Sequence, residues 1–372
     1  MTIELFPIIT FYVKIFYDSQ AFSLQDYGGV SRIFSELKKG SENLQHFDAY
    51  ISIVFSNNVH LASTNTSYSQ FVKRREIIKR TNRLLNIAEL LTKKFDLYHP
   101  TYYDTSMGKY ARTKPLVVTF HDLTQERFVN QFPVLRKEEY VIKQKKEAAS
   151  WADHIIAVSE NTKADLIDIY GVESEKVSVV PLGSSFTQTS PTDDVLVKEP
   201  YLLYVGNRAL YKNFQPFVVA SAQVLKLNSI KLVCAGGNQF SDEELLLFKA
   251  NGVDHLIIHK EINDKILANL YAGALAFVFP SLYEGFGIPV LEAFSCNCPC
   301  VLSRTSSLPE VAGNAAIYFD PHSNESIVES LNRIIFDSEL RNDLIIRGTR
   351  RLRDFSWEKH VSQTVTVYKS LI

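Results

Sequence analysis

Short runs of β-branched and aromatic residues alternate with helical patterns along nearly the whole chain. This alternation predicts parallel sheets that are covered by helices. The runs predict strands at 13–17, 49–55, 95–99, 115–120, 154–158 and 176–181, and again at 201–206, 230–236, 255–259, 274–280 and 299–303. Helices are expected near 29–39, 71–92, 137–150, 160–169, 213–227, 241–250, 263–271, 289–296, 323–336, 338–352 and 356–371.

A polar stretch separates two similar α/β series. Residues 184–199 are rich in Ser, Thr and Asp and contain Pro191, a composition typical of a linker. The pattern therefore predicts two doubly wound domains. Ligands of such sheets bind beyond the carboxyl ends of the strands, so we expect the site in a cleft between the domains.

Composition narrows the class of protein. The 372 residues are 46% hydrophobic with a formal net charge of −1, which fits about two domains and disfavours nucleic-acid binding. No run of about 18 apolar residues is present, and the first residues lack a basic leader and a cleavage site, so a cytoplasmic protein is expected. The four cysteines include Cys296, Cys298 and Cys300, which we expect to be small buried residues rather than a metal site.

The stretch YEGFGIPVLEAF, residues 283–294, places two glutamates around a glycine-rich turn. It follows a predicted buried strand, and Pro289 suits the first turn of a helix. Free N–H groups at that helix start can hold an anion or sugar hydroxyls, and both Glu284 and Glu292 can address the same ligand. Alternatively, Glu284 is a solvated loop residue and Glu292 a partner of the helix dipole. Spacing alone leaves both interpretations open.

Two cations follow the first strand of the second series. Arg208 and Lys212 come just after Gly206 and suit a diphosphate. The arginine can donate two parallel hydrogen bonds to it, and the lysine supplies a compact positive charge. The alternative is a pair of surface cations on a loop. The chain contains no Asp-x-Asp pair, so these cations are the favoured substitute for a metal-held diphosphate.

Three weaker signals lie in the first half. Gly28 and Gly29 stand between a strand and a helix, either as a plain turn or as a phosphate or substrate contact. His121 and Asp122 follow a buried strand, where a histidine is either structural or part of the cleft. Residues 71–94 hold eight Lys and Arg against two Glu, which predicts a solvated basic helix or attraction to an anionic membrane or acceptor.

Taken together, these motifs resemble the retaining glycosyltransferases of the GT-B fold, specifically family 4, in members that build bacterial surface polysaccharides. The resemblance covers nearly the whole chain from Lys14, with its motifs in the family's order. It is carried by HPTYYD, TFHDL, IIAVSENTKADLIDIYGV, VSVVPLG, VGNRALYKN, PSLYEGFGIPVLEAFSCNCPCVLS and SSLPEVAGNAAIYFDP.

The resemblance implies a role for each matching residue. Glu284 would contact the donor sugar, Glu292 the ribose, and Arg208 and Lys212 the departing diphosphate, with His121 at the reaction centre. The implied catalytic set is His121, Arg208, Lys212 and Glu284. The implied donor-binding set is Gly28, Gly29, Gly206, Arg208, Lys212, Glu284, Gly285, Phe286, Gly287, Ile288 and Glu292.

The resemblance also implies the architecture and the reaction. We expect an acceptor-side Rossmann-like domain over 1–190, a nucleotide-sugar-binding domain over 191–355, and a helix over 356–372 that returns to the first domain. The expected reaction is transfer of a hexose from GDP-mannose or a UDP-hexose to a glycan or lipid-linked acceptor with retention, without metal or cofactor. Contact with the inner membrane surface is a further expectation. The alternatives are a nucleotide-sugar epimerase and a non-catalytic binding homologue.

The sequence departs from the family in two places. Relatives usually begin near Lys14, so residues 1–12 are an extension. Similar sequences often carry a histidine where Gln125 stands, and that position is assigned no role.

Overall fold

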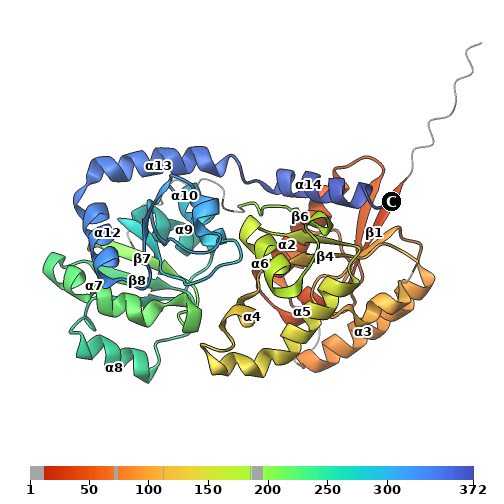
Figure 1. The fold of residues 1–372 in the computed structure, drawn as a ribbon, viewed down its shortest axis with the longest axis horizontal. Helices are drawn as coiled ribbons and strands as arrows, with labels where there is room; N and C mark the ends of the chain where they lie inside the picture. Colours follow the sequence, from red (N-terminus) through yellow and green to blue (C-terminus); the bar gives the residue numbers. More distant parts are fainter. Residues whose placement is uncertain (1–11, 71–73, 112, 185, 187–195) are drawn as a thin grey trace, which may run out of the picture.

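The structure, a computed structural model, describes residues 12–70, 74–111, 113–184, 186 and 196–372. The expected division at 190/191 and the extension before Tyr12 lie outside these residues. Within them, two Rossmann-like halves lie along the long axis of the molecule (Figure 1). Each half is built around parallel strands, which confirms the predicted α/β architecture.

The N-terminal half contains two three-stranded parallel sheets, ordered β2-β1-β3 and β4-β5-β6. A single bridge between Tyr98 and Leu116 joins β3 to β4, and Tyr98 N donates to Pro115 O over 3.0 Å. The six strands therefore lie side by side across this half in the order β2-β1-β3-β4-β5-β6. Their bounds are β1 Val13–Tyr17, β2 Phe47–Ile51, β3 Leu97–His99, β4 Val117–Phe120, β5 His154–Ala157 and β6 Val177–Val179.

The strand predicted over 49–55 is wrong at its C-terminal end, because β2 ends at Ile51. Ile51 pairs with Tyr17, the last residue of β1. Beyond that point, amide side chains of α3 (Arg75–Thr92) bind the backbone: Asn86 Nδ2 donates to Ser52 O over 2.7 Å, and Asn82 Oδ1 accepts from Val54 N over 3.0 Å. These long-range amide contacts end the strand without a turn signal in the sequence.

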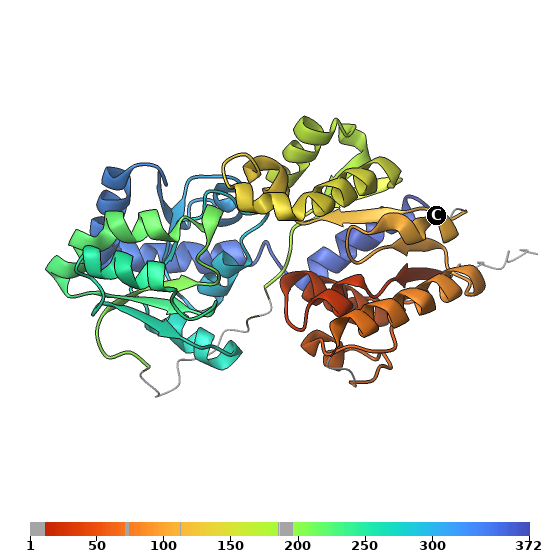
Figure 2. The same ribbon diagram turned by 90° about the horizontal axis from the view of Figure 1, so that it is seen from below.

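Helices surround the N-terminal strands. The α-helices are α1 Gln20–Leu24, α2 Gly29–Glu42, α3 Arg75–Thr92, α4 Thr124–Phe128, α5 Glu139–Trp151 and α6 Glu160–Tyr170. The 3₁₀ turns of this half are η1 Val59–Ser63, η2 Thr105–Tyr110, η3 Pro133–Glu138 and η4 Ser174–Lys176. Figure 2 shows the two halves from below, with the α4–α5 region on one side and α1–α3 on the other.

The C-terminal half has one six-stranded parallel sheet, ordered β12-β11-β10-β7-β8-β9. Its strands are β7 Tyr201–Val205, β8 Lys231–Ala235, β9 Ile257–Lys260, β10 Ala276–Phe279, β11 Cys300–Ser303 and β12 Ala316–Phe319. Strand β12, which the sequence did not predict, is four residues long and pairs with β11 at the edge of the sheet. All four cysteines are buried and free, as expected for structural residues.

The helices of this half are η5 Leu210–Lys212, α7 Phe214–Asn228, α8 Asp242–Ala250, α9 Asp264–Gly273, α10 Ile288–Ser295, α11 Leu308–Ala312, α12 Asn324–Phe336 and α13 Ser338–Leu352. None of the helices in the described ranges is both long and apolar enough to cross a bilayer.

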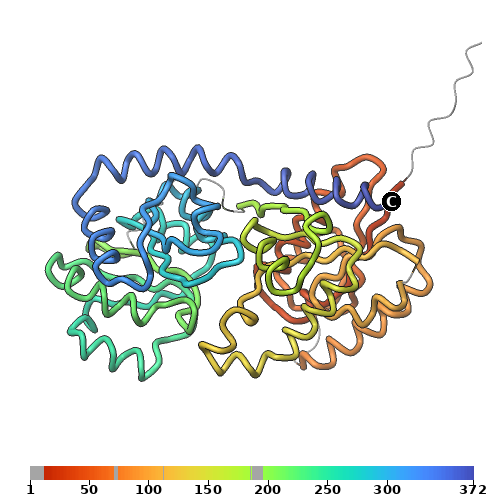
Figure 3. Tube along the Cα trace, in the orientation of Figure 1, coloured from red at the N-terminus to blue at the C-terminus, as the bar shows by residue number. Residues whose placement is uncertain are grey.

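The last helix, α14 Trp357–Lys369, leaves the C-terminal half and packs on α2 of the N-terminal half. Figure 3 shows the blue C-terminal trace crossing from one half to the other. Tyr368 anchors it: its hydroxyl shares hydrogen bonds with Tyr17 Oη over 3.0 Å and His99 Nδ1 over 2.6 Å. Burial lowers the pKa of His99 to about 3, so this cluster is uncharged at neutral pH. The returning helix is thus confirmed.

Replacing Tyr368 with Phe should weaken this anchor. The Tyr368→Phe protein loses a hydroxyl that serves two buried partners, and its free energy of unfolding should fall by about 1–3 kcal/mol in urea denaturation. Tyr12→Phe, at a 53% exposed position, is the matched control and should leave stability unchanged. Equal stability of the two variants would show that the buried hydroxyl contributes nothing to docking of α14.

Candidate functional site

The candidate site is built on the turn between β10 and α10. Gly287 caps α10 with a φ of 104°, a left-handed conformation that favours glycine. Pro289 lies in the first turn of the helix, as expected. Glu284 lies in the preceding loop and Glu292 one turn inside the helix.

The N-terminal half holds this loop through α6. Ser159 Oγ and Thr162 Oγ1 donate to Gly285 O over 2.6 and 3.2 Å. Tyr283 Oη donates to Asp165 Oδ2 over 2.5 Å. These three partners in and beside α6 were not predicted. The local sequence around Ser159 does not indicate that it contacts Gly285, 126 residues away.

His121 meets the same loop from β4. A Cβ on Gly285 would lie only 1.8 Å from His121 O, so only glycine fits between the two halves. Burial lowers the pKa of His121 to about 4, which keeps its imidazole neutral at pH 7. The structure therefore brings His121 and Gly285 together, as the cleft hypothesis predicted.

Asp122, the next residue, is held by a buried lysine. Lys145 Nζ lies 3.2 Å from Asp122 Oδ1 and donates to Asp122 O over 3.0 Å. Burial raises the pKa of Asp122, but the Lys145 charge outweighs it, and the pKa falls to about 2. The pair fixes the loop that carries His121.

Glu284 and Lys212 form an ion pair, with 2.7 Å between Lys212 Nζ and Glu284 Oε1. Burial acts to lower the pKa of Lys212, but the Glu284 carboxylate prevails and raises it. The backbone of Glu284 is fixed as well, since its N–H donates to Ser306 Oγ over 2.9 Å and its carbonyl accepts from Ser307 Oγ over 2.8 Å. Only 14% of the Glu284 side chain is exposed, so the solvated-loop alternative is wrong.

The Arg208 guanidinium makes more contacts within the protein than the sequence led us to expect. Its Nε donates to Glu244 Oε1 over 2.7 Å, and Nη2 donates to Asn238 O over 2.7 Å. Among the described residues, Arg208 Nη1 is one of the buried atoms that have no hydrogen-bond partner. Glu244 and the Asn238 carbonyl therefore hold the guanidinium, and Nη1 is its unpaired corner. Gly206, at the end of β7, has a φ of 106° and turns the chain into this loop.

Glu292 is the most perturbed carboxyl group of the site. It is 8% exposed and accepts a hydrogen bond from Tyr271 Oη over 3.2 Å. Burial raises its pKa to about 7, against the opposing charge of Arg32 on α2. Glu292 is therefore a buried carboxyl group one turn into α10, in contact with α9 through Tyr271.

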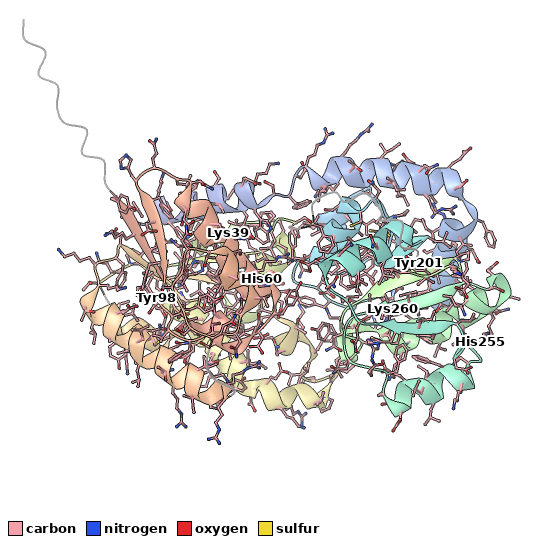
Figure 4. All side chains as sticks on the ribbon, turned by 180° about the vertical axis from the view of Figure 1, so that it is seen from behind. Lys39, His60, Tyr98, Tyr201, His255 and Lys260 are labelled. Carbon is pink, nitrogen blue, oxygen red and sulfur yellow. The ribbon has the colours of Figure 1, made fainter. Side chains whose placement is uncertain are left out.

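The start of α2 faces α10 and α9. A Cβ on Gly29 would lie 3.8 Å from Ile288 Cδ1, and Arg32 Nη2 lies 3.9 Å from Asp264 Oδ2. Tyr27 Oη also donates to Asp264 over 3.3 Å. Figure 4 shows His60, whose ring lies 5.1 Å from that of Tyr27, on the side of the N-terminal half that faces the C-terminal half. The Gly28–Gly29 turn therefore adjoins the predicted donor-binding helix.

A cavity of about 640 Å³ adjoins the loop after β7. Its wall includes Arg208 and Asn213 from the C-terminal half and Gln131 and Phe132 from the N-terminal half. Neither glutamate of the 283–294 stretch lines it. This cavity therefore borders Arg208 without being lined by Glu284 or Glu292.

Two family models match successive parts of the chain. The family model described as Glycosyltransferase Family 4 matches residues 27–185, and the model described as Glycosyl transferases group 1 matches residues 189–351. The O-antigen chain mannosyltransferase B of Escherichia coli is 29% identical over 324 residues, which are 83% of this chain and 84% of that protein.

Solved structures share the fold. A sucrose-phosphate synthase from Thermosynechococcus elongatus has a TM-score of 0.78 at 21% identity, over 96% of this chain and 99% of that one. HepE from Anabaena, in complex with UDP-glucose, has a TM-score of 0.74 at 16% identity, over 96% of this chain and 100% of that one.

The raised pKa of Glu292 predicts a pH-dependent stability in the ligand-free protein. The folded state keeps a proton that the unfolded state releases from pH 4.5 upward, so the free energy of unfolding falls as pH rises from about 4.5 to about 7. Glu292→Gln removes this loss. We expect it to stabilise the protein by on the order of 3 kcal/mol at pH 8 and much less at pH 5, in urea denaturation at each pH.

Glu329→Gln, at an exposed position on α12, is the control and should show no such difference between the two pH values. If Glu292→Gln had the same effect at pH 5 and pH 8, a raised pKa for Glu292 would be ruled out.

Proposed function

This chain is a family 4-like glycosyltransferase of the GT-B fold, and we propose that it moves a hexose from a nucleotide sugar to a glycan or lipid-linked acceptor with retention of configuration. The observation that carries the donor assignment is the partly buried Lys212–Glu284 pair before the α10 start, where the neighbouring Gly285 lies against His121. The epimerase and the non-catalytic homologue are not favoured by the mannosyltransferase relatives.

Each predicted residue has a proposed role. Glu284 accepts hydrogen bonds from hydroxyls of the donor sugar, and the backbone N–H groups of residues 285–288 face the same ligand. Glu292 accepts hydrogen bonds from the ribose hydroxyls, in the way that it already accepts one from the Tyr271 hydroxyl. Lys212 and the free corner of Arg208 bind the diphosphate.

The charges support a metal-independent transfer. Breaking the bond from sugar to diphosphate builds negative charge on the leaving group, and Lys212, Arg208 and the α10 start supply fixed positive potential there. The leaving phosphate takes the proton of the acceptor hydroxyl, so no separate base is needed. Neutral His121 lines the sugar as a hydrogen-bonding group rather than as a cation.

The donor proposed first is GDP-mannose, with a UDP-hexose second. The Escherichia coli relative is named a mannosyltransferase of O-antigen chains, and surface-polysaccharide synthesis is the process we propose here. The Anabaena neighbour was solved with UDP-glucose, which supports keeping UDP-sugars in the test.

Thermal denaturation with GDP-, UDP-, ADP- and dTDP-sugars tests the donor assignment. A specific donor at 100 times its dissociation constant should add about 2.7 kcal/mol of stability. With that donor, Lys212→Ala should reduce the transfer rate about 100-fold or more, because one preorganised positive group at the leaving phosphate is lost.

Lys249→Ala, an exposed position on α8, is the matched control and should transfer at the wild-type rate. If none of the nucleotide sugars stabilised the protein, the proposed function would be overturned. Full activity of Lys212→Ala would remove that residue from the mechanism.

A second proposal concerns the membrane. Helix α3 exposes Ile77, Leu84 and Leu91 by 45%, 70% and 64%, at intervals of two helical turns and therefore on one face. Cations on the same helix, Arg75, Lys79, Arg80 and Arg83, exceed its two glutamates. An apolar stripe with surrounding positive charge suits the interface of an anionic membrane, and we place this enzyme at the inner face of the cytoplasmic membrane. Figures 1 and 2 show α3 on the outer side of the N-terminal half.

Vesicle sedimentation tests this surface. The wild-type protein should pellet with vesicles containing phosphatidylglycerol, and Leu84→Ser/Leu91→Ser should reduce the bound fraction several-fold by removing apolar contact. Leu227→Ser, at a 75% exposed position on α7, should bind like wild type. Sedimentation that is equal for the double variant and wild type would assign membrane contact elsewhere or to charge alone.

A further inference from the structure

Lys145, on α5, carries a buried positive charge that the proposed reaction does not use. Its side chain is only 2% exposed. Its Nζ has four oxygen atoms around it: Asp122 O at 3.0 Å, Asp122 Oδ1 at 3.2 Å, Gln125 Oε1 at 2.7 Å and Glu126 Oε2 at 3.4 Å. All four belong to the segment that leads into and through the start of α4, so a single ammonium group binds this whole turn.

The position of Lys145 on its helix is one that normally holds an apolar side chain. The other buried residues of α5 are Val141, Ala148 and Ala149, one turn before and after it. These spacings place Lys145 on the face of the helix that packs on the core. An ion there loses its hydration, and the fold tolerates it only because counter-charges surround it. A methionine would fill a similar volume without that cost, so the charge itself points to a function.

Two carboxylates balance this charge, and they differ in how far they depend on it. Glu126, whose side chain is 3% exposed, also accepts a hydrogen bond from Tyr170 Oη over 2.5 Å. Asp122, whose side chain is 36% exposed, also accepts one from Thr124 N over 3.0 Å, which ties it only to its own turn. Lys145 is therefore the charged group that joins Asp122 to α5.

The same turn meets the C-terminal half. Leu123 N donates to Tyr283 Oη over 3.2 Å. A Cβ on Gly285 would lie 1.8 Å from His121 O and 2.9 Å from Asp122 Cβ. Because the two backbones are already in contact, a displacement of this turn would move either the imidazole or the facing loop of the candidate site.

The charges around His121 oppose each other. Burial is the largest influence on its pKa and lowers it to about 4, Asp122 acts to raise it, and Lys145 and His360 act to lower it. Burial also lowers the pKa of His360 to about 4, so this neighbour is uncharged at pH 7. The ionised neighbours that act on the imidazole are therefore Asp122 and Lys145, which have opposite effects.

The other titratable groups around His121 are uncharged at pH 7 or paired. Burial lowers the pKa of His99 to about 3 and raises that of Tyr103 well above its usual value. Glu284, in the facing loop, is paired with Lys212 over 2.7 Å. A change of the buried lysine would therefore act on the imidazole mainly through its carboxylate partner.

From these contacts we propose that Lys145 is a positioning residue for hexose transfer, which fixes the turn into α4 and neutralises the Asp122 carboxylate beside His121. The inference rests on the proposed function, which places His121 at the reaction centre. Without the lysine charge, Asp122 would favour a protonated imidazole. The sugar ring gains positive charge as its bond to the diphosphate breaks, and an imidazolium ion next to it would oppose that step.

NMR of the ligand-free full chain measures the charge balance directly. Histidine is isotopically labelled, and the His121 signal is identified by its absence from His121→Gln and followed through a pH titration. Lys145→Met keeps a similar side-chain length and removes the charge, so it should raise the pKa of His121 from about 4 to at least about 5. Lys145→Met/Asp122→Asn removes both charges and should return the pKa to its wild-type value.

Transfer kinetics test the positioning role, with the donor found by thermal denaturation. At pH 6, Lys145→Met should lower kcat roughly tenfold or more and change KM for the donor by less than about twofold, because the donor contacts remain and the reaction centre is displaced. The loss should be smaller at pH 8, where the imidazole is neutral again, and in Lys145→Met/Asp122→Asn. Glu292, with a pKa of about 7, is present in every variant, so the readout is the difference between variants at each pH.

Two further variants complete the design. Lys146→Met, at the next and exposed position of α5, is the matched control and should behave like wild type in both measurements. Lys145→Met/Glu126→Gln removes the buried carboxylate that would lose its partner and still leaves Asp122 unopposed. It should raise the pKa of His121 even if Lys145→Met alone does not fold.

Stabilisation by the donor in thermal denaturation should persist in each of these variants. A wild-type pKa of His121 in both Lys145→Met and Lys145→Met/Glu126→Gln would overturn this inference alone, as would a wild-type kcat of Lys145→Met at pH 6. If no nucleotide sugar stabilised the wild-type protein, the proposed function would fall, and the NMR comparison would still report the charge balance at His121.

Discussion

The site depends on one close approach, that of the loop before α10 to the N-terminal half. Gly285 meets the carbonyl of His121, and its own carbonyl accepts hydrogen bonds from Ser159 and Thr162. Tyr283, two residues earlier, reaches Asp165 on α6. Since the same loop carries Glu284, the position of a predicted sugar-binding carboxylate is set by backbone contacts to the opposite half. The two halves therefore build the site jointly.

Charged groups in the site are paired before any ligand arrives. Lys212 pairs with Glu284, Arg208 with Glu244, and Lys145 with Asp122. Buried charges without partners are costly, so this pairing lets the fold tolerate several ionisable groups in a small volume. Glu292 is the exception, because its nearest strong partner is a tyrosine hydroxyl, and its pKa rises accordingly. The Lys212–Glu284 and Arg208–Glu244 pairs also orient the side chains that we propose bind the nucleotide sugar.

Helix α14 adds a second connection between the halves, remote from the site. Its Tyr368 hydroxyl lies in a neutral cluster with Tyr17 and His99, and α13 precedes it along the C-terminal half. Helix α14 ends the chain after the C-terminal half but packs on α2 of the N-terminal half. It therefore restrains how far the two halves can separate. Helix α3, at the outer side of the same half, carries the proposed membrane surface.

The sequence by itself determined the alternation of strands and helices and the turn at Gly285–Gly287, because periodicity and glycine-rich turns are local signals. It also marked Arg208, Lys212, Glu284, Glu292 and His121 as candidate site residues, through their positions after predicted strands and through the family resemblance. It missed β12 and misplaced the end of β2, where pairing at the sheet edge and amide side chains from α3 decide the outcome. Only the tertiary structure decided which groups meet. Ser159, Asp165, Glu244 and Arg32 reach the site from distant segments, and nothing in their local sequence marks a partner. Burial, which sets the pKa of Glu292 and the single free corner of Arg208, likewise follows from packing alone.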